Sequence, residues 1–139
     1  RVAGCGGFIN ITQNAKKVVF CGTMTAGGLK VEVKDGKLNI LQEGRSKKFL
    51  PQVEQITFSG DYAREKGQPV LYVTERAVLE LRPEGMVLTE IAPGVDLQKD
   101  VLDQIDFKVK VADDLKLMDE RIFRPEPMGI RAEIMNKQK

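Results

Sequence analysis

The sequence of 139 residues contains no histidine. This absence excludes every mechanism that takes an imidazole base from this chain, including the Ser-His-Asp and Cys-His arrangements. Cysteine is scarce as well: Cys5 and Cys21 are the only two, and they lack the CxxC spacing of a thiolate metal site. We therefore expect two reduced thiols and no metal site.

Long apolar runs and a strong charge excess are also missing. No run approaches the roughly 20 apolar residues that cross a bilayer, and the N-terminus lacks the basic-then-apolar pattern of an export signal. Lys and Arg number 22 against 20 Asp and Glu, and a net charge of +2 is too small to favour nucleic acid or an acidic membrane surface. We expect a soluble, cytoplasmic chain with neither kind of partner.

The beginning of the sequence is unusual. Arg1 stands where an initiator methionine is normally found, and a glycine cluster follows almost directly. We interpret the chain as an excised or processed piece of a longer protein. Apolar residues make up 42% of the sequence, which is sufficient for the core of one ordinary domain or of part of a larger one.

The spacing of apolar residues near the N-terminus predicts an α/β arrangement. Phe8, Ile9 and Ile11 follow the glycine cluster in a segment that we expect to be helical. Residues 18–21 are an unbroken apolar run, which suits a buried strand of a parallel sheet. A turn, a short helix and a buried strand in this order are typical of an α/β protein.

Hairpins are predicted in the middle of the chain. Residues 29–33 and 38–41 alternate between apolar and polar side chains, and Asp35 and Gly36 lie in the short polar loop between them. Three further segments are strand-like: residues 70–73, 78–81 and 86–88. A Pro-Glu-Gly turn joins the last two of them.

The pattern of residues in the last part of the chain predicts one helix followed by an irregular tail. Asp96 is placed to cap a helix whose apolar positions, which lie near one face, are Leu97, Val101, Leu102 and Ile105. Residues 119–139 combine prolines and charges with little periodicity, so we expect them to be extended or partly disordered unless another segment of a larger protein covers them. The predicted fold is α/β: part of a mostly parallel open sheet with β-hairpin additions and a C-terminal helix.

The glycine cluster Gly4, Cys5, Gly6 and Gly7 has a structural and a functional interpretation. Glycines commonly mark turns because they admit positive φ. They also let a backbone approach a ligand closely, and free N–H groups at a following helix start can hold an anion or a developing oxyanion. A nucleophilic role for Cys5 is a further alternative, because a helix start favours a thiolate.

Charged residues offer two weaker candidates. Glu75 and Arg76 interrupt two apolar runs, where Glu75 is either a general base or an ion-pair partner, although neighbouring opposite charges at a strand junction are usually a solvated turn. Arg45, Lys47 and Lys48 are candidates for contact with a nucleotide phosphate. A solvated loop is the simpler interpretation of these three residues, because lysines are mostly exposed.

Taken together, these segments resemble the C-terminal half of the class I coenzyme A (CoA) transferases. The resemblance is nearest to the fused acetate, propionate and short-chain acyl enzymes, and it runs over nearly the whole chain. The matching segments, in the order and spacing of the family, are residues 4–11 (GCGGFINI), 15–20 (AKKVVF), 74–78 (TERAV) and 88–94 (LTEIAPG). The resemblance implies that residues 1–139 are the C-terminal portion of the second domain of such an enzyme.

The same resemblance implies a mechanism and partners. Enzymes of this family use a glutamate nucleophile and pass through a glutamyl-CoA thioester in a ping-pong reaction, with acyl-CoA and carboxylates as substrates and no permanently bound cofactor. That glutamate belongs to a segment upstream of the glycine cluster. Glu75 and Glu90 do not match its position, so this chain is expected to contain no catalytic residue and to be inactive alone. An upstream half of the same enzyme and further copies in a homo-oligomer are its implied protein partners.

By resemblance, CoA and the reaction's oxyanion are bound at Gly4, Gly6 and Gly7. Gly4 shapes the turn, and either Gly6 or Gly7 donates a backbone N–H. The alternative is a noncatalytic binding or oligomerisation module in which the glycine turn is purely structural.

Overall fold

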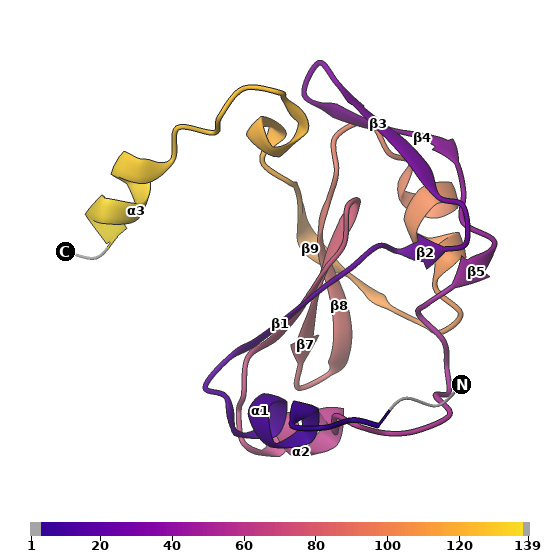
Figure 1. The fold of residues 1–139 in the computed structure, drawn as a ribbon, viewed down its shortest axis with the longest axis vertical. Coiled ribbons are helices and arrows are strands. Elements are labelled where there is room, and N and C mark those ends of the chain that lie inside the picture. The colour runs from indigo at the N-terminus through magenta and orange to yellow at the C-terminus, as the bar shows by residue number, and fades with distance from the viewer. Residues whose placement is uncertain (1–3, 138–139) are drawn as a thin grey trace.

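The computed structural model of the chain describes residues 4–137. Its centre is a five-stranded sheet with the strand order β1-β6-β7-β8-β9 (Figure 1). The strands of this sheet are β1 (Val18–Cys21), β6 (Val70–Val73), β7 (Ala77–Arg82), β8 (Gly85–Ile91) and β9 (Lys110–Leu117). Helices α1 (Phe8–Asn14) and α2 (Gly60–Glu65) lie together at one end of the sheet.

The sheet is mixed, with parallel pairs at its two sides and antiparallel pairs in the middle. β1 and β6 are parallel, as are β8 and β9, whereas β6, β7 and β8 form an antiparallel meander. The meander contains the predicted hairpin between residues 78–81 and 86–88. The expected α/β class with hairpin additions and a C-terminal helix is confirmed.

A second hairpin and a small ribbon lie beside the sheet. β3 (Lys30–Lys34) and β4 (Lys37–Gln42) are antiparallel, as the alternation of their residues predicts. Asp35 and Gly36 form the turn with φ values of 53° and 74°, a conformation that asparagine-like residues and glycine tolerate best. β2 (Thr25–Ala26) and β5 (Ser46–Lys47) pair on the same side of the molecule (Figure 1).

The main core lies between the sheet and the segment after β8. Leu79 of β7, Leu88 of β8 and Val101 are fully buried and form one cluster with Met24. Burying one such aliphatic side chain contributes about 1.5–3 kcal/mol. A second cluster of Val18, Ala63 and Val70 fixes α2 to the parallel strands.

The first strand differs from its prediction in burial. Val18 is buried, but Val19 is 48% exposed and Cys21 is exposed. The reason is that β1 lies at the side of the sheet, and within residues 4–137 it pairs only with β6. The expected parallel pairing is present, whereas the expected complete burial of this strand is wrong for the described part of the chain.

The helix predicted after Asp96 begins as expected but has a different geometry. The Asp96 carboxylate accepts a hydrogen bond from the backbone N–H of Lys99 at 2.7 Å, which is an N-cap interaction. The segment then forms a π-helix, η1 (Leu97–Val101), and a short 3₁₀-helix, η2 (Leu102–Gln104). Val101, at the junction, has φ −121° and ψ −66° and is fully buried, so the chain departs from α-helical geometry where its apolar side chain enters the core.

The tail also differs from its prediction. It contains a 3₁₀-helix, η3 (Glu120–Phe123), and a helix, α3 (Arg131–Lys137), where we expected extended or partly disordered chain. Phe123 is only 3% exposed and packs with Leu38 and Met118, which anchors η3. α3 itself lies apart from the sheet (Figure 1). Residues 138–139 of this expected tail lie outside the described residues.

Candidate functional site

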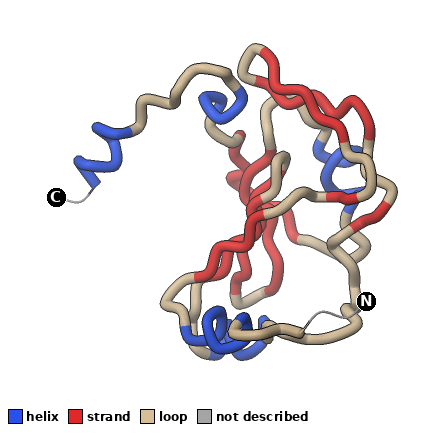
Figure 2. The backbone as a smooth tube through the Cα atoms, in the orientation of Figure 1, coloured by secondary structure: helices blue, strands red, loops and turns tan. Residues whose placement is uncertain are grey.

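A cavity of about 380 Å³ opens beyond the carboxyl ends of β1 and β6. Ligands of open α/β sheets are commonly bound at the carboxyl ends of parallel strands. The apolar part of the lining includes Phe20, Phe49, Leu50, Tyr72, Met86 and Phe107. One wall belongs to the long loop of residues 48–59 between β5 and α2, which contains neither helix nor strand (Figure 2).

Aromatic side chains connect this cavity to the glycine turn. Phe8, the first residue after the glycines, stacks on Phe20 with ring centroids 6.0 Å apart. Phe20 in turn stacks on Tyr72 at 5.1 Å, and Phe49 meets Tyr72 edge to face at 6.5 Å. Pairs of this kind contribute about 0.5–1.5 kcal/mol beyond the area that they bury. The aromatic row therefore fixes the start of α1 relative to the cavity.

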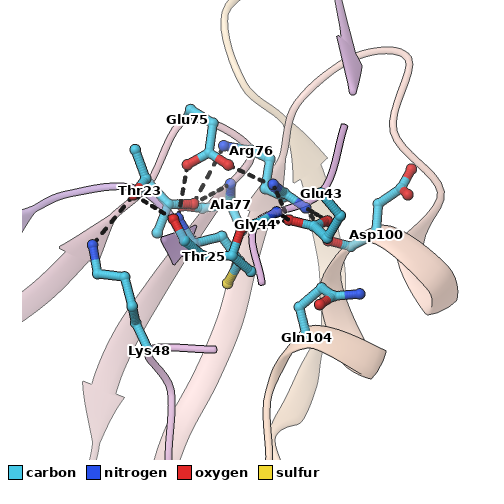
Figure 3. Close-up of polar contacts among 12 residues, drawn as sticks. Thr23, Thr25, Glu43, Gly44, Lys48, Glu75, Arg76, Ala77, Asp100 and Gln104 are labelled. Atoms are coloured by element: carbon cyan, nitrogen blue, oxygen red, sulfur yellow. Dashed lines mark hydrogen bonds and ion pairs between the residues drawn. The ribbon is translucent and has the colours of Figure 1, made fainter. Parts of the chain in front are cut away.

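A buried arginine organises the polar side of the site (Figure 3). Arg76, between β6 and β7, has no exposed surface. Its Nε donates to Glu75 Oε1 at 2.6 Å, and its Nη1 donates to Glu43 Oε2 at 2.6 Å and to the Asp100 carbonyl at 3.0 Å. The buried positive charge is thus compensated by two carboxylates, as a buried charge requires.

The two carboxylates also hold the segment before β2. Glu75 Oε2 accepts a hydrogen bond from the backbone N–H of Met24 at 2.8 Å. Glu43 accepts one from the Thr25 hydroxyl and one from the Gly44 N–H. Residues 22–25 are therefore fixed to the end of β6, and the first two of them line the cavity.

This environment determines the charge states of the ion-pair network. Burial raises the pKa of Glu43, but hydrogen bonds from Arg76, Thr25 and Gly44, together with the charge of Arg76, outweigh it and lower this pKa from 4.5 to about 2. Burial lowers the pKa of Arg76, and its hydrogen bonds to Glu43 and Glu75 and their charges raise it above its usual value. The pair is therefore fully ionised near neutral pH.

Glu75 is an ion-pair partner rather than an available base. One of its oxygens accepts from Arg76 and the other from Met24. The expectation of a solvated turn at Glu75 and Arg76 is wrong, because Arg76 is completely buried.

The three basic candidates have separate surroundings. Lys47 forms an ion pair with Asp106 at 2.6 Å. Lys48 Nζ lies 3.3 Å from the Thr23 hydroxyl, at the cavity. Arg45 lies against Gly27. These residues do not form one cluster of free cations, and phosphate binding by them stays a hypothesis.

The predicted glycine turn directly precedes α1. Gly6 has φ +50°, a left-handed conformation that favours glycine, and Gly7 is the N-cap residue. Side-chain positions at Gly4 and Gly6 would meet no atom within 4 Å among the described residues. Neither Gly6 nor Gly7 donates its N–H to another backbone group within residues 4–137. This geometry is compatible with an anion-binding turn, and the binding role itself stays a prediction.

The cysteines, the possible metal ligands and the helix lengths complete the description of the site. Cys5 and Cys21 form no disulfide within residues 4–137, and their reduced state stays a prediction. Residues 4–137 contain no group of three or more His, Cys, Asp or Glu side chains that could hold a metal ion. No helix in the same residues is long and apolar enough to cross a membrane.

Sequence reasoning missed the cavity and the role of Glu43. The residues that form them come from segments far apart in the sequence, so no local pattern marks them. The nearest signal was the arginine inside the strand-like run at residues 70–81, because a charge in such a run needs a buried partner.

Comparison with known proteins identifies relatives of the chain. No protein-family model matches it. The acetate CoA-transferase YdiF of Escherichia coli (strain K12) is 57% identical over 129 residues, which are 93% of this chain and 24% of that protein. The caffeate CoA-transferase of Acetobacterium woodii is 58% identical over 130 residues, which are 94% of this chain and 25% of that protein.

The fold agrees with these similarities. A crystal structure of the acyl-CoA transferase YdiF from E. coli O157:H7, in a thioester complex with CoA, matches with a TM-score of 0.90 and 57% identity, over 93% of this chain and 25% of that chain. The chain spans about a quarter of the length of the relatives that it matches. The resemblance to the CoA-transferases is confirmed, and this chain is related in sequence and in fold to about one quarter of such an enzyme.

Proposed function

We propose that this chain is part of an acyl-CoA:carboxylate CoA-transferase and that it supplies a wall of the active site. The observation that supports this most directly is the 57% identity over 129 residues to an acetate CoA-transferase. The TM-score of 0.90 to a CoA-transferase crystallised as a thioester with CoA agrees with it. CoA enters as a substrate, and no permanent cofactor is part of the proposal.

The proposed reaction passes through a glutamate that lies upstream of this chain in the full-length protein. Its carboxylate attacks the acyl thioester, CoA thiolate leaves, and an acyl-glutamyl anhydride remains. The thiolate then attacks the glutamyl carbonyl, which releases the carboxylate product and forms a glutamyl-CoA thioester. An acceptor carboxylate repeats these steps in reverse, so no oxidant, reductant or water is consumed. Covalent catalysis of this kind divides one difficult transfer into easier ones.

The role of this chain in that reaction is to stabilise charge. Each step forms a tetrahedral intermediate whose oxygen needs a hydrogen-bond donor, and one such donor commonly contributes a factor of about 10²–10³ to kcat. The Gly6 or Gly7 N–H is the proposed donor, with Gly4 shaping the turn. The proposal is supported by the left-handed Gly6 and by the placement of both glycines before α1.

The whole protein is proposed to be cytoplasmic and to act as a homo-oligomer. Its substrates are acyl-CoA and free carboxylates, and this chain on its own is proposed to be inactive, because it requires the upstream half for the nucleophile. The related enzymes are named for acetate and for caffeate, and they have nearly the same identity to this chain.

The test is to trap the covalent intermediate in the full-length protein. After incubation with acetyl-CoA and rapid quenching, we expect the intact mass to increase by one CoA, and peptide mapping to place the adduct on a glutamate upstream of this chain. If the folded full-length protein forms no adduct, the transferase proposal is wrong and a noncatalytic binding module becomes the better interpretation.

A further inference from the structure

The cavity beside β1 and β6 has a composition that points to one class of ligand. Most of its lining is aliphatic or aromatic, and Lys48 is the single charged residue among the described residues that line it. Small-molecule sites typically combine such an apolar body with a few polar groups that orient the ligand. A ligand with an apolar body and a single negative end fits this arrangement.

The volume of the cavity favours acyl groups that are larger than an acetyl group. An acetyl group consists of a methyl and a carbonyl, whereas the cavity measures about 380 Å³ and a water molecule occupies roughly 30 Å³ of liquid. An acetyl group would leave most of this space unfilled by the ligand. A longer aliphatic chain or an aromatic ring fills it and gains the contacts that stabilise apolar groups away from water.

The polar groups at the cavity are suited to a carboxylate or a carbonyl. No ion pair of Lys48 is found within residues 4–137, and the hydrogen bond that its Nζ makes there is to the Thr23 hydroxyl. Tyr72 is half-buried, burial raises the pKa of its hydroxyl, and no hydrogen bond of that hydroxyl is found within the same residues. A tyrosine hydroxyl both donates and accepts hydrogen bonds, so it can pair with a ligand oxygen at the cavity.

Resting on the proposed function, we infer that this cavity binds the acyl part of the substrate and selects monocarboxylates with an aliphatic or aromatic body larger than acetate. Lys48 faces the carboxylate of the free acid. The aromatic row from Phe8 through Phe20 to Tyr72 places the acyl body next to the glycine turn. A dicarboxylate is disfavoured, because the second charge would enter the apolar part of the lining.

The first experiment fills the cavity from its exposed side. Val53 lines it but is 60% exposed on the loop after β5, so Val53→Trp adds an indole without disturbing the core. In the full-length protein, we expect kcat/KM for hexanoyl-CoA to fall at least tenfold more than kcat/KM for acetyl-CoA, because pocket contacts discriminate acyl groups by such factors. Leu117→Trp, at an exposed position of β9 away from the cavity, is the matched control and should change neither value.

The second experiment separates the carboxylate contact from the apolar contact. Lys48→Met should weaken binding of free hexanoate about tenfold, measured by calorimetry, and should lower kcat/KM for hexanoyl-CoA by a smaller factor, because a thioester has no carboxylate. Val53→Trp should weaken hexanoate binding as well. Succinate should bind more weakly than hexanoate to the unmodified protein.

The outcomes distinguish this inference from the proposed function. If the full-length protein transfers CoA but Val53→Trp lowers the values for acetyl-CoA and hexanoyl-CoA equally, the cavity holds the CoA arm or another part of the protein, and the inference is overturned. If no CoA transfer occurs while hexanoate binding still depends on Val53 and Lys48, the carboxylate site stands and the transferase proposal fails. Absence of hexanoate binding to an active transferase would overturn the inference alone.

Discussion

Arg76 and Glu43 meet in a two-point ion pair: Arg76 Nη1 donates to Glu43 Oε2 at 2.6 Å and Nη2 donates to Oε1 at 3.1 Å. The parallel geometry joins the end of β4 to the turn between β6 and β7 (Figure 3). Arginine suits this position better than lysine, because its planar fork serves both Glu43 oxygens and the Glu75 carboxylate at once. Through Glu75 and Met24 the pair also fixes one wall of the cavity.

Removing the arginine should therefore loosen the wall of the cavity. Arg76→Met leaves the Glu43 and Glu75 carboxylates without their partner, and breaking a buried pair in this way costs about 3–5 kcal/mol. We expect faster hydrogen exchange in residues 22–26 and a lower melting temperature of the full-length protein. Arg82→Met, which breaks a partly exposed pair with Glu80, is the matched control and should cost less than about 1 kcal/mol. Equal effects of the two variants would contradict a special role for Arg76.

The low pKa of Glu43 predicts a dependence of stability on acid. Its folded pKa of about 2 lies below its ordinary value of 4.5, so its ionised form stabilises the fold above pH 4.5. This contribution is lost as the pH falls from about 4.5 toward 2. We expect Glu43→Gln to be less stable than wild type at neutral pH and to lack this part of the acid-induced loss. Urea midpoints measured from pH 7 to pH 2 test this.

The hydrogen bond from Thr25 to Glu43 allows a second test of the acid dependence. Thr25→Val removes one of the hydrogen bonds that lower the pKa of Glu43, so the part of the acid-induced loss of stability that comes from Glu43 should be smaller than in wild type and should be complete at a higher pH. Identical acid profiles of wild type, Glu43→Gln and Thr25→Val would show that other groups determine acid unfolding.

Local patterns in the sequence were sufficient for the hairpins and for the first helix. Asp35 and Gly36 between two alternating runs specify a turn without help from the rest of the chain. The pairing of strands is different, because it depends on contacts between distant segments. Burial of β1 depends on what lies on its second side, and an apolar run such as residues 18–21 does not contain that information.

The candidate site also combines features that local sequence predicts with features that depend on contacts between distant segments. The glycine turn is a continuous motif and was found as one. The network of Arg76 joins residues that are 33 and 24 positions apart in the sequence, so no spacing rule predicts it. η3 was missed for a related reason: Phe123 is anchored by Leu38 and Met118, and its burial outweighs the low helical periodicity of the tail.

The proposed oxyanion donor can be tested at Gly7 by comparing two substitutions. Gly7 has φ −79°, which lies within the range of proline, and its N–H makes no backbone hydrogen bond within residues 4–137. Gly7→Pro removes the N–H, whereas Gly7→Ala retains it and places Cβ at an ordinary contact distance of 3.5 Å from Ile11. If Gly7 is the donor, Gly7→Pro should lower kcat about 10²–10³-fold relative to Gly7→Ala. Equal rates of the two variants would leave Gly6 as the candidate donor.

Ion pairs near the surface attach α3 to the turn before it. Arg121 Nη1 donates to Glu133 of α3 at 2.6 Å, and the same guanidinium pairs with Asp119. A helix of seven residues is too short to be stable alone, so α3 depends on such contacts. We expect Arg121→Gln to speed hydrogen exchange of α3, and high salt to do the same in wild type through screening.

Arg124→Gln is the matched control, because Arg124 pairs with Glu120 inside the neighbouring turn and not with α3. Its exchange in α3 should equal that of wild type. Because exposed ion pairs contribute only about 0.2–1 kcal/mol, neither variant should change the melting temperature of the full-length protein noticeably. Unchanged exchange of α3 in Arg121→Gln would mean that contacts beyond residues 4–137 hold this helix, and the ion pair would then be incidental to its position.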